Sequence, residues 1–68
     1  MMDQSTTPEE AIRMAIERER GSYEFYTQAA QIAIYPGTRQ MFEHLAKEEL
    51  RHRKMLEEEL NKNYSPDM

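Results

Sequence analysis

The sequence predicts an all-α fold: an antiparallel helical hairpin that dimerises into a four-helix bundle. Apolar residues recur at a spacing near 3.6 over two long stretches, and Pro36 and Gly37 interrupt the chain between them. A chain of 68 residues is also too short for a single hairpin to bury a hydrophobic core large enough for stable folding. Since a lone hairpin leaves one side of each helix wet, we expect two copies to cover each other, with residues 1–68 as a single domain.

The first helix is expected over about residues 8–34. Thr7 stands as the N-cap before Pro8, a residue suited to the first helical position, and Glu10 is placed to close a capping box with Thr7. Residues 1–6 are expected to be flexible. The apolar or small residues that follow at helical spacing are Ile12, Ala15, Ile16, Ser22, Tyr23, Tyr26, Ala29, Ala30 and Ala33.

The second helix is expected over about residues 39–61, after a turn at residues 35–38. Thr38 is the candidate N-cap of this helix, and residues 62–68 are expected to be flexible because they combine polar residues with a proline. The apolar seam of the second helix contains Phe42, Leu45, Glu49, His52, Leu56 and Leu60, with Met41 and Met55 on its flank.

Composition excludes several classes of protein. The formal net charge is -4, with 13 acidic and 9 basic residues, so a nucleic-acid partner is not expected. No stretch resembles a signal peptide or a membrane-spanning helix, which predicts a cytoplasmic protein without a membrane partner. The absence of cysteine removes disulfides and thiolate metal sites, and leaves oxygen and nitrogen ligands.

Three polar residues interrupt the apolar seams. Glu49 and His52 are three residues apart and therefore share a helix face, and Glu19 lies seven residues from both Ile12 and Tyr26 on the first helix. Burying unpaired carboxylates costs several kcal/mol, and a metal cation removes that cost. With a twofold copy the set becomes four carboxylates and two imidazoles, whose charge of -4 two divalent ions cancel. These ligands suit iron or manganese, and zinc is an alternative.

Other interpretations stay open at this point. A chain with eleven glutamates produces a Glu-x-x-His motif by chance at appreciable frequency, and Glu49 and His52 would then only set the register of a non-catalytic dimerisation or interaction module. A further alternative is an iron-binding accessory that stores or delivers the metal without turnover.

The segments "AIERERGSYEFY" and "FEHLAKEELRHRKMLEEEL" resemble the rubrerythrin-type branch of the ferritin-like superfamily, over about residues 11–60. The resemblance implies a ferritin-like four-helix bundle with a di-iron centre. Glu19 would be the terminal ligand from the first helix, Glu49 the bridging carboxylate and His52 the terminal nitrogen ligand, all three being catalytic. Tyr26 matches a tyrosine that hydrogen-bonds the ligand carboxylates.

The resemblance also implies an assembly and an activity. Full-length relatives carry two such helix pairs in one chain, and this chain carries one, so the site would form at a homodimer interface, with two irons per dimer. The short ferritin-like proteins packaged inside encapsulin shells are built in this way, which makes such a shell a possible partner. The implied function is oxidation of ferrous iron by dioxygen or peroxide, an oxidoreductase activity in iron handling or oxidative-stress defence.

The chain departs from rubrerythrins at two places. It has no cysteine and hence no rubredoxin-type iron site, so peroxide reduction would need a separate electron donor. Rubrerythrins also carry an additional ligand glutamate one turn after the first-helix ligand, where this chain has Ser22. Iron binding and ferrous oxidation are therefore better supported by the resemblance than peroxide reduction.

Overall fold

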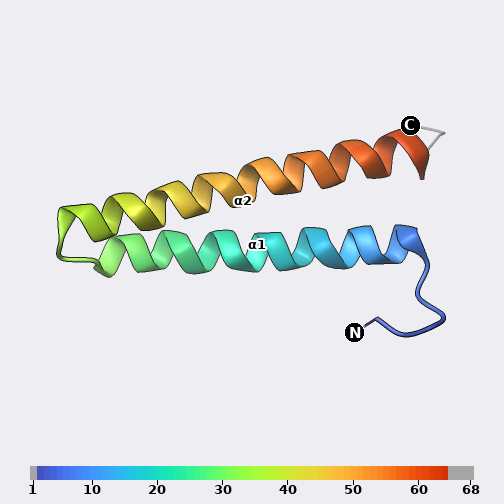
Figure 1. The fold of residues 1–68 in the computed structure, drawn as a ribbon, viewed down its shortest axis with the longest axis horizontal. Coiled ribbons are helices and arrows are strands. Elements are labelled where there is room, and N and C mark those ends of the chain that lie inside the picture. The colour runs from blue at the N-terminus through green and yellow to red at the C-terminus, as the bar shows by residue number, and fades with distance from the viewer. Residues whose placement is uncertain (1, 65–68) are drawn as a thin grey trace.

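Two long antiparallel helices make up the protein. The computed structural model describes residues 2–64, in which α1 (Pro8–Ile32) and α2 (Pro36–Asn63) lie side by side and are joined by a short connection (Figure 1). The described part of the chain contains no strand. The predicted all-α helical hairpin is confirmed, whereas its pairing with a second copy stays a prediction.

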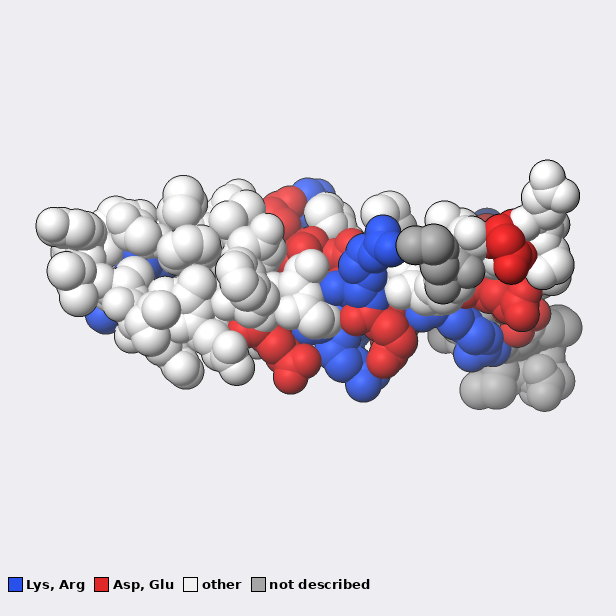
Figure 2. Space-filling view, turned by 90° about the horizontal axis from the view of Figure 1, so that it is seen from below, with Lys and Arg blue, Asp and Glu red and all other residues white. Residues whose placement is uncertain are grey.

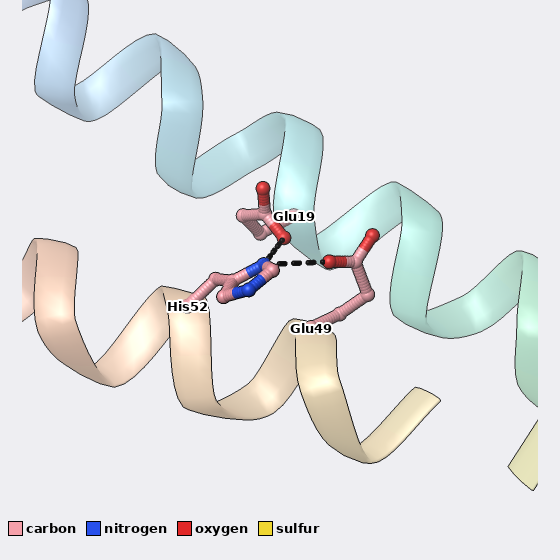
Figure 3. Close-up of side chains that lie close together, drawn as sticks. All are labelled: Glu19, Glu49 and His52. Carbon is pink, nitrogen blue, oxygen red and sulfur yellow. Dashed lines mark hydrogen bonds and ion pairs between the residues drawn. The ribbon is translucent and has the colours of Figure 1, made fainter. Parts of the chain in front are cut away.

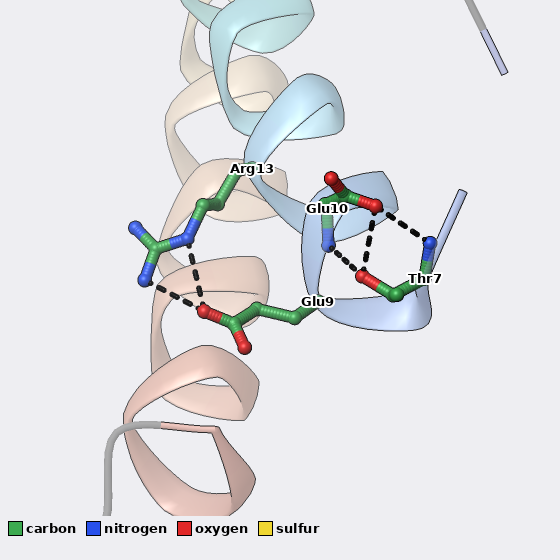
Figure 4. A network of polar contacts seen from close by, with 4 residues as sticks. All are labelled: Thr7, Glu9, Glu10 and Arg13. Carbon is green, nitrogen blue, oxygen red and sulfur yellow. Dashed lines mark hydrogen bonds and ion pairs between the residues drawn. The ribbon is translucent and has the colours of Figure 1, made fainter. Parts of the chain in front are cut away.

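The start of α1 follows the predicted capping box. The backbone N–H of Glu10 donates to the Thr7 hydroxyl at 3.1 Å, and the backbone N–H of Thr7 donates to the Glu10 carboxylate at 2.8 Å (Figure 4). Pro8 occupies the first turn, and Glu9 forms an ion pair with Arg13 at 3.1 Å. The two capping-box hydrogen bonds satisfy backbone N–H groups that have no partner inside the helix.

The connection between the helices is shorter than expected. α1 ends at Ile32 and α2 begins at Pro36, so the turn spans residues 33–35 and not 35–38. Tyr35 is extended, with φ -92° and ψ 128°, because a residue that precedes proline avoids the helical region. Pro36 itself fits the first helical position. Thr38 therefore lies inside the first turn of α2, and its assignment as the N-cap was wrong.

Both ends of the hairpin contain more regular structure than expected. α2 runs to Asn63, and the backbone N–H of Tyr64 donates to the Leu60 carbonyl at 2.9 Å. Residues 3–6 form a turn in which the backbone N–H of Ser5 donates to the Asp3 carboxylate at 2.9 Å. Most of the predicted flexible C-terminal segment, residues 65–68, lies outside the described residues.

The hairpin is one layer thick. Its Cα atoms extend 45 × 26 × 12 Å, and the radius of gyration is 15.0 Å, where a compact chain of this length has about 11 Å. Among the described residues only Ala30, Ala46 and Leu60 are buried, and no large side chain is fully enclosed. The single hairpin therefore has no closed hydrophobic core.

Charge is distributed unevenly along the hairpin. Residues 25–38, which form the end of α1, the connection and the start of α2, contain no lysine, arginine, aspartate or glutamate. Figure 2 accordingly shows charged side chains gathered over the half of the molecule that is remote from the connection. Neither helix is both long and apolar enough to span a lipid bilayer.

Candidate metal centre

The hairpin brings the three seam residues of opposite helices together. α1 supplies Glu19, and α2 supplies Glu49 and His52, whose spacing of three residues places them on one face (Figure 3). One ligand atom from each residue lies within 4.8 Å of the other two. No other group of three or more potential ligands occurs within residues 2–64.

The imidazole of His52 lies between the two carboxylates. Its Nδ1 atom is 3.1 Å from Oε1 of Glu49 and 3.5 Å from Oε2 of Glu19. Oε2 of Glu19 is buried and has no hydrogen-bond partner among the described residues. A buried oxygen of this kind normally requires a partner, and a cation held between the three side chains would provide one. The geometry and the donor types therefore fit a metal ion.

The proximity of the two carboxyl groups shifts their protonation in opposite directions. The close approach of the Glu49 carboxyl group, together with burial and the negative charge of Glu49, raises the pKa of Glu19 above its usual range. The same pairing holds the pKa of Glu49 below its usual range, with His52 and Ser22 contributing in the same direction. Of the two groups, Glu19 therefore takes up a proton first as the pH falls, and a bound cation would compete with that proton.

The centre is half enclosed. The side chains of Glu19 and Glu49 are 21% and 15% exposed, whereas that of His52 is 43% exposed. Three donors fill only half of the six positions that iron or manganese prefers when its ligands are mainly oxygen. One hairpin thus supplies part of a coordination shell and leaves one side of it uncovered.

The sequence predicts a role beside the ligands for Tyr26 but none for Ser22. The ring of Tyr26 stacks on Phe42 with centroids 6.2 Å apart and meets Phe25 edge-on at 5.5 Å. Its proposed hydrogen bond to the ligand carboxylates stays a prediction. Ser22, which helical spacing identifies only as a seam residue and the family pattern only as the place of an absent glutamate, lowers the pKa of Glu49. Its position one turn after Glu19 is the signal that could have revealed this role.

A helical hairpin that pairs a glutamate on one helix with Glu-x-x-His on the next defines a class, the ferritin-like carboxylate proteins. Comparison with family models agrees, because the model described as Rubrerythrin matches residues 2–64. The chain belongs to the rubrerythrin family. No curated protein and no solved structure matches it.

Proposed function

We propose that two copies of this chain bind two iron ions between them and oxidise ferrous iron with dioxygen or peroxide. The observation that carries the proposal is the convergence of Glu19, Glu49 and His52, including the buried Oε2 of Glu19 that lacks a partner. Glu19 and His52 would each hold one ion, and Glu49 would bridge the pair. Two such sets bring four carboxylates, whose charge two divalent ions neutralise.

The chemistry follows from what a pair of irons supplies, namely two electrons delivered together. Oxidation of two ferrous ions to the ferric state would supply two electrons, which with two protons would convert dioxygen to hydrogen peroxide, or peroxide to two waters. The protein's residues hold the ions at fixed positions and supply negative charge that favours the ferric state. This activity would serve iron handling or defence against oxidative stress in the cytoplasm.

Several parts of the proposal concern partners. Return of the ferric pair to the ferrous state needs a separate electron donor, because the sequence has no cysteine to ligate a second iron centre. An encapsulin shell is a further proposed partner, on the resemblance to packaged ferritin-like proteins. Manganese or zinc could occupy the same ligands, but zinc would not support the redox step.

The decisive experiment measures iron content and oxygen consumption together. Ferrous iron is added to the metal-free protein in air, and bound iron, absorbance and dissolved oxygen are followed. We expect two irons per dimer with consumption of oxygen. Iron bound without oxygen consumption would indicate an accessory without turnover, and a colourless, iron-free protein would indicate an interaction module.

Substitution of a ligand supplies the matched comparison. Glu49→Ala removes the bridging carboxylate and should abolish the stoichiometric iron binding. Glu58→Ala removes an equally charged, exposed side chain from the same helix and should leave binding unchanged. Two irons per dimer retained by Glu49→Ala would overturn the assignment of the site.

A further inference from the structure

The three candidate ligands are not equally accessible from solvent. The side chain of His52 is more exposed than the side chains of Glu19 and Glu49. A metal ion that arrives from water therefore meets His52 before it meets the carboxylates. The residues one and two helical turns away from His52 decide whether the protein can hold an ion on its way to the centre.

One direction along α2 offers further ligand atoms. Toward the connection, Glu48 precedes His52 by four residues, and His44 precedes Glu48 by another four, so the three side chains form one row on the helix surface. In the opposite direction, the residues three and four positions after His52 are Met55 and Leu56, which have neither a carboxylate nor an imidazole. The row of ligating residues thus continues on one side of His52.

The neighbouring residues of α1 do not extend this row. Arg18 is adjacent to Glu19 and carries a positive charge, which repels a cation. Ala15 and Ser22, which lie one turn before and one turn after Glu19, carry no charge. The side chains around the centre therefore favour the approach of a cation along α2.

Glu48 lies between two imidazoles in this row. Its side chain is 32% exposed and His44 is exposed, so both are in contact with water. Arg51 donates a hydrogen bond to the Glu48 carboxylate and holds the pKa of Glu48 below its usual range, and the charges of His44 and His52 act in the same direction. The carboxylate is thus negatively charged at neutral pH and lies within electrostatic range of both rings.

We propose that His44 and Glu48 form a weak surface site for a hydrated divalent transition-metal ion, and that iron passes from this site to His52. Side chains four residues apart on a helix have Cβ atoms about 5–6 Å apart, a spacing at which two of them can bind one ion. A carboxylate and an imidazole are ligands that ferrous iron accepts. The proposal rests on the proposed function for the destination of the ion.

The site is weak for two reasons. Two protein ligands leave most coordination positions of the ion to water, and Arg51 competes with the ion for the Glu48 carboxylate. Low affinity suits a site of passage, because an ion that is transferred must be able to leave.

The first test measures the rate of ferrous iron oxidation in air at increasing iron concentrations. We expect His44→Ala and Glu48→Gln each to raise the KM for ferrous iron at least fivefold, with kcat within twofold of wild type and two irons still bound per dimer. The control Glu58→Gln, at an exposed position of the same helix, should leave KM and kcat unchanged. A wild-type KM in His44→Ala, or a lower kcat or iron content in either variant, would overturn the proposal.

His44→Ala separates ligation from the attraction of opposite charges. An imidazole is neutral or positively charged, so its removal does not weaken the electrostatic attraction of a cation. A higher KM in His44→Ala therefore indicates the loss of a ligand. A higher KM in Glu48→Gln alone would indicate only the loss of a negative charge, and would contradict a two-residue site.

A second measurement detects the site without any oxidation. In the Glu49→Ala protein, which lacks the bridging carboxylate, manganese should broaden the NMR signals of the His44 imidazole. At the same manganese concentration, Glu48→Gln added to this variant should reduce the broadening at least fivefold, whereas Glu58→Gln added to it should not. Equal broadening in the two double variants would overturn the surface site.

The two proposals fail in different ways. Broadening of His44 that depends on Glu48, in a protein that oxidises no iron, would contradict the proposed function and retain the surface site. Oxidation with two irons per dimer and a wild-type KM in His44→Ala would retain the function and overturn the surface site.

Discussion

Glu19 and Glu49 are two carboxyl groups that share one half-enclosed space, and in the metal-free protein their proximity favours the protonated form of Glu19. Because the pKa of Glu19 is raised in the folded state, the folded chain binds a proton that the unfolded chain releases. By linkage, the contribution of Glu19 to the free energy of unfolding increases as the pH falls through its folded pKa, and is least favourable above that pKa. The ionised carboxylate thus lowers the stability of the metal-free protein, and a bound cation would remove that cost.

Glu19→Gln replaces the carboxylate by a neutral side chain of the same shape. With a chelator present at pH 7, we expect this variant to have a higher free energy of unfolding than wild type, because the repulsion between the carboxylates is gone. The advantage should shrink as the pH falls, since wild-type Glu19 then takes up its proton. Urea unfolding followed by circular dichroism from pH 7 to pH 5, at one protein concentration, measures both effects.

The matched control for this prediction is Glu24→Gln, an exposed position on the same helix. It should change the free energy of unfolding by less than about 0.5 kcal/mol at either pH. In the presence of metal the order should reverse, with Glu19→Gln less stable than wild type. A Glu19→Gln protein that is destabilised without metal at pH 7 would mean that the carboxylate has a stabilising partner.

Ser22 is the basis of a separate prediction, because it would act on a bound metal through Glu49. Its hydroxyl lowers the pKa of Glu49, which indicates that it interacts with this carboxylate; Ser22→Ala should therefore leave the carboxylate less well oriented and weaken metal binding by about tenfold, as for other residues that orient metal ligands. Ser22→Thr keeps the hydroxyl and should recover most of the affinity. Calorimetric titration with manganese measures the affinity without redox chemistry, and equal affinity in all three proteins would show that Ser22 has no such role.

Different interactions fix the N-termini of the two helices. α1 begins at a complete capping box, whereas the N-cap of α2, Tyr35, offers no side-chain hydrogen bond and is fixed by the proline that follows it. Arg39 adds a tertiary contact to the connection by donating to the Ala33 carbonyl at 3.0 Å. The local sequence thus sets the start of α1, and both local and tertiary contacts set the connection.

Thr7→Ala tests the capping box of α1. We expect a loss of about 1 kcal/mol in the free energy of unfolding, because the Glu10 N–H loses its acceptor, and Thr7→Ser should retain most of the stability. Hydrogen bonds from Thr7 hold the pKa of Glu10 below its usual value of 4.5. The contribution of Glu10 is therefore present above that value and is lost as the pH falls through the lower folded pKa. Thermal unfolding at pH 7 and pH 3 checks both points.

The same contrast explains which elements could be predicted from the sequence. Thr7, Pro8 and Glu10 act within one turn, so their arrangement follows from local rules, and the start of α1 was predicted correctly. The start of α2 was placed too late, because Thr38 is a good capping residue in isolation while Pro36 already satisfies the first helical position. The sequence offers Thr38 as an N-cap and Pro36 as a first helical residue, and only the path of the chain in the structure shows which of the two begins the helix.

For the whole molecule, the grouping of Glu19, Glu49 and His52 was predictable because an antiparallel hairpin with a short connection fixes the levels of these residues on the two helices to within about two turns. The sequence could not predict the burial of Oε2 of Glu19 or the effect of Ser22 on Glu49. Both depend on side-chain contacts between the two helices. Helical periodicity also identifies apolar residues without stating which of them a hairpin leaves uncovered.

Assembly, metal and stability should therefore be coupled in the intact protein. If two copies share the metal ligands, metal binds the folded dimer in preference to the unfolded chain, and metal at a hundred times its dissociation constant adds about 2.7 kcal/mol to the free energy of unfolding. The melting temperature should rise with protein concentration, rise further with manganese, and fall on addition of a chelator. Differential scanning calorimetry over a hundredfold range of protein concentration makes this measurement. Glu49→Ala should keep the concentration dependence and lose the response to metal, because it removes a candidate ligand and leaves the apolar side chains of the hairpin unchanged. If the melting temperature of wild type changes neither with protein concentration nor with metal, the hairpin is a monomer whose exposed ligands hold no shared metal.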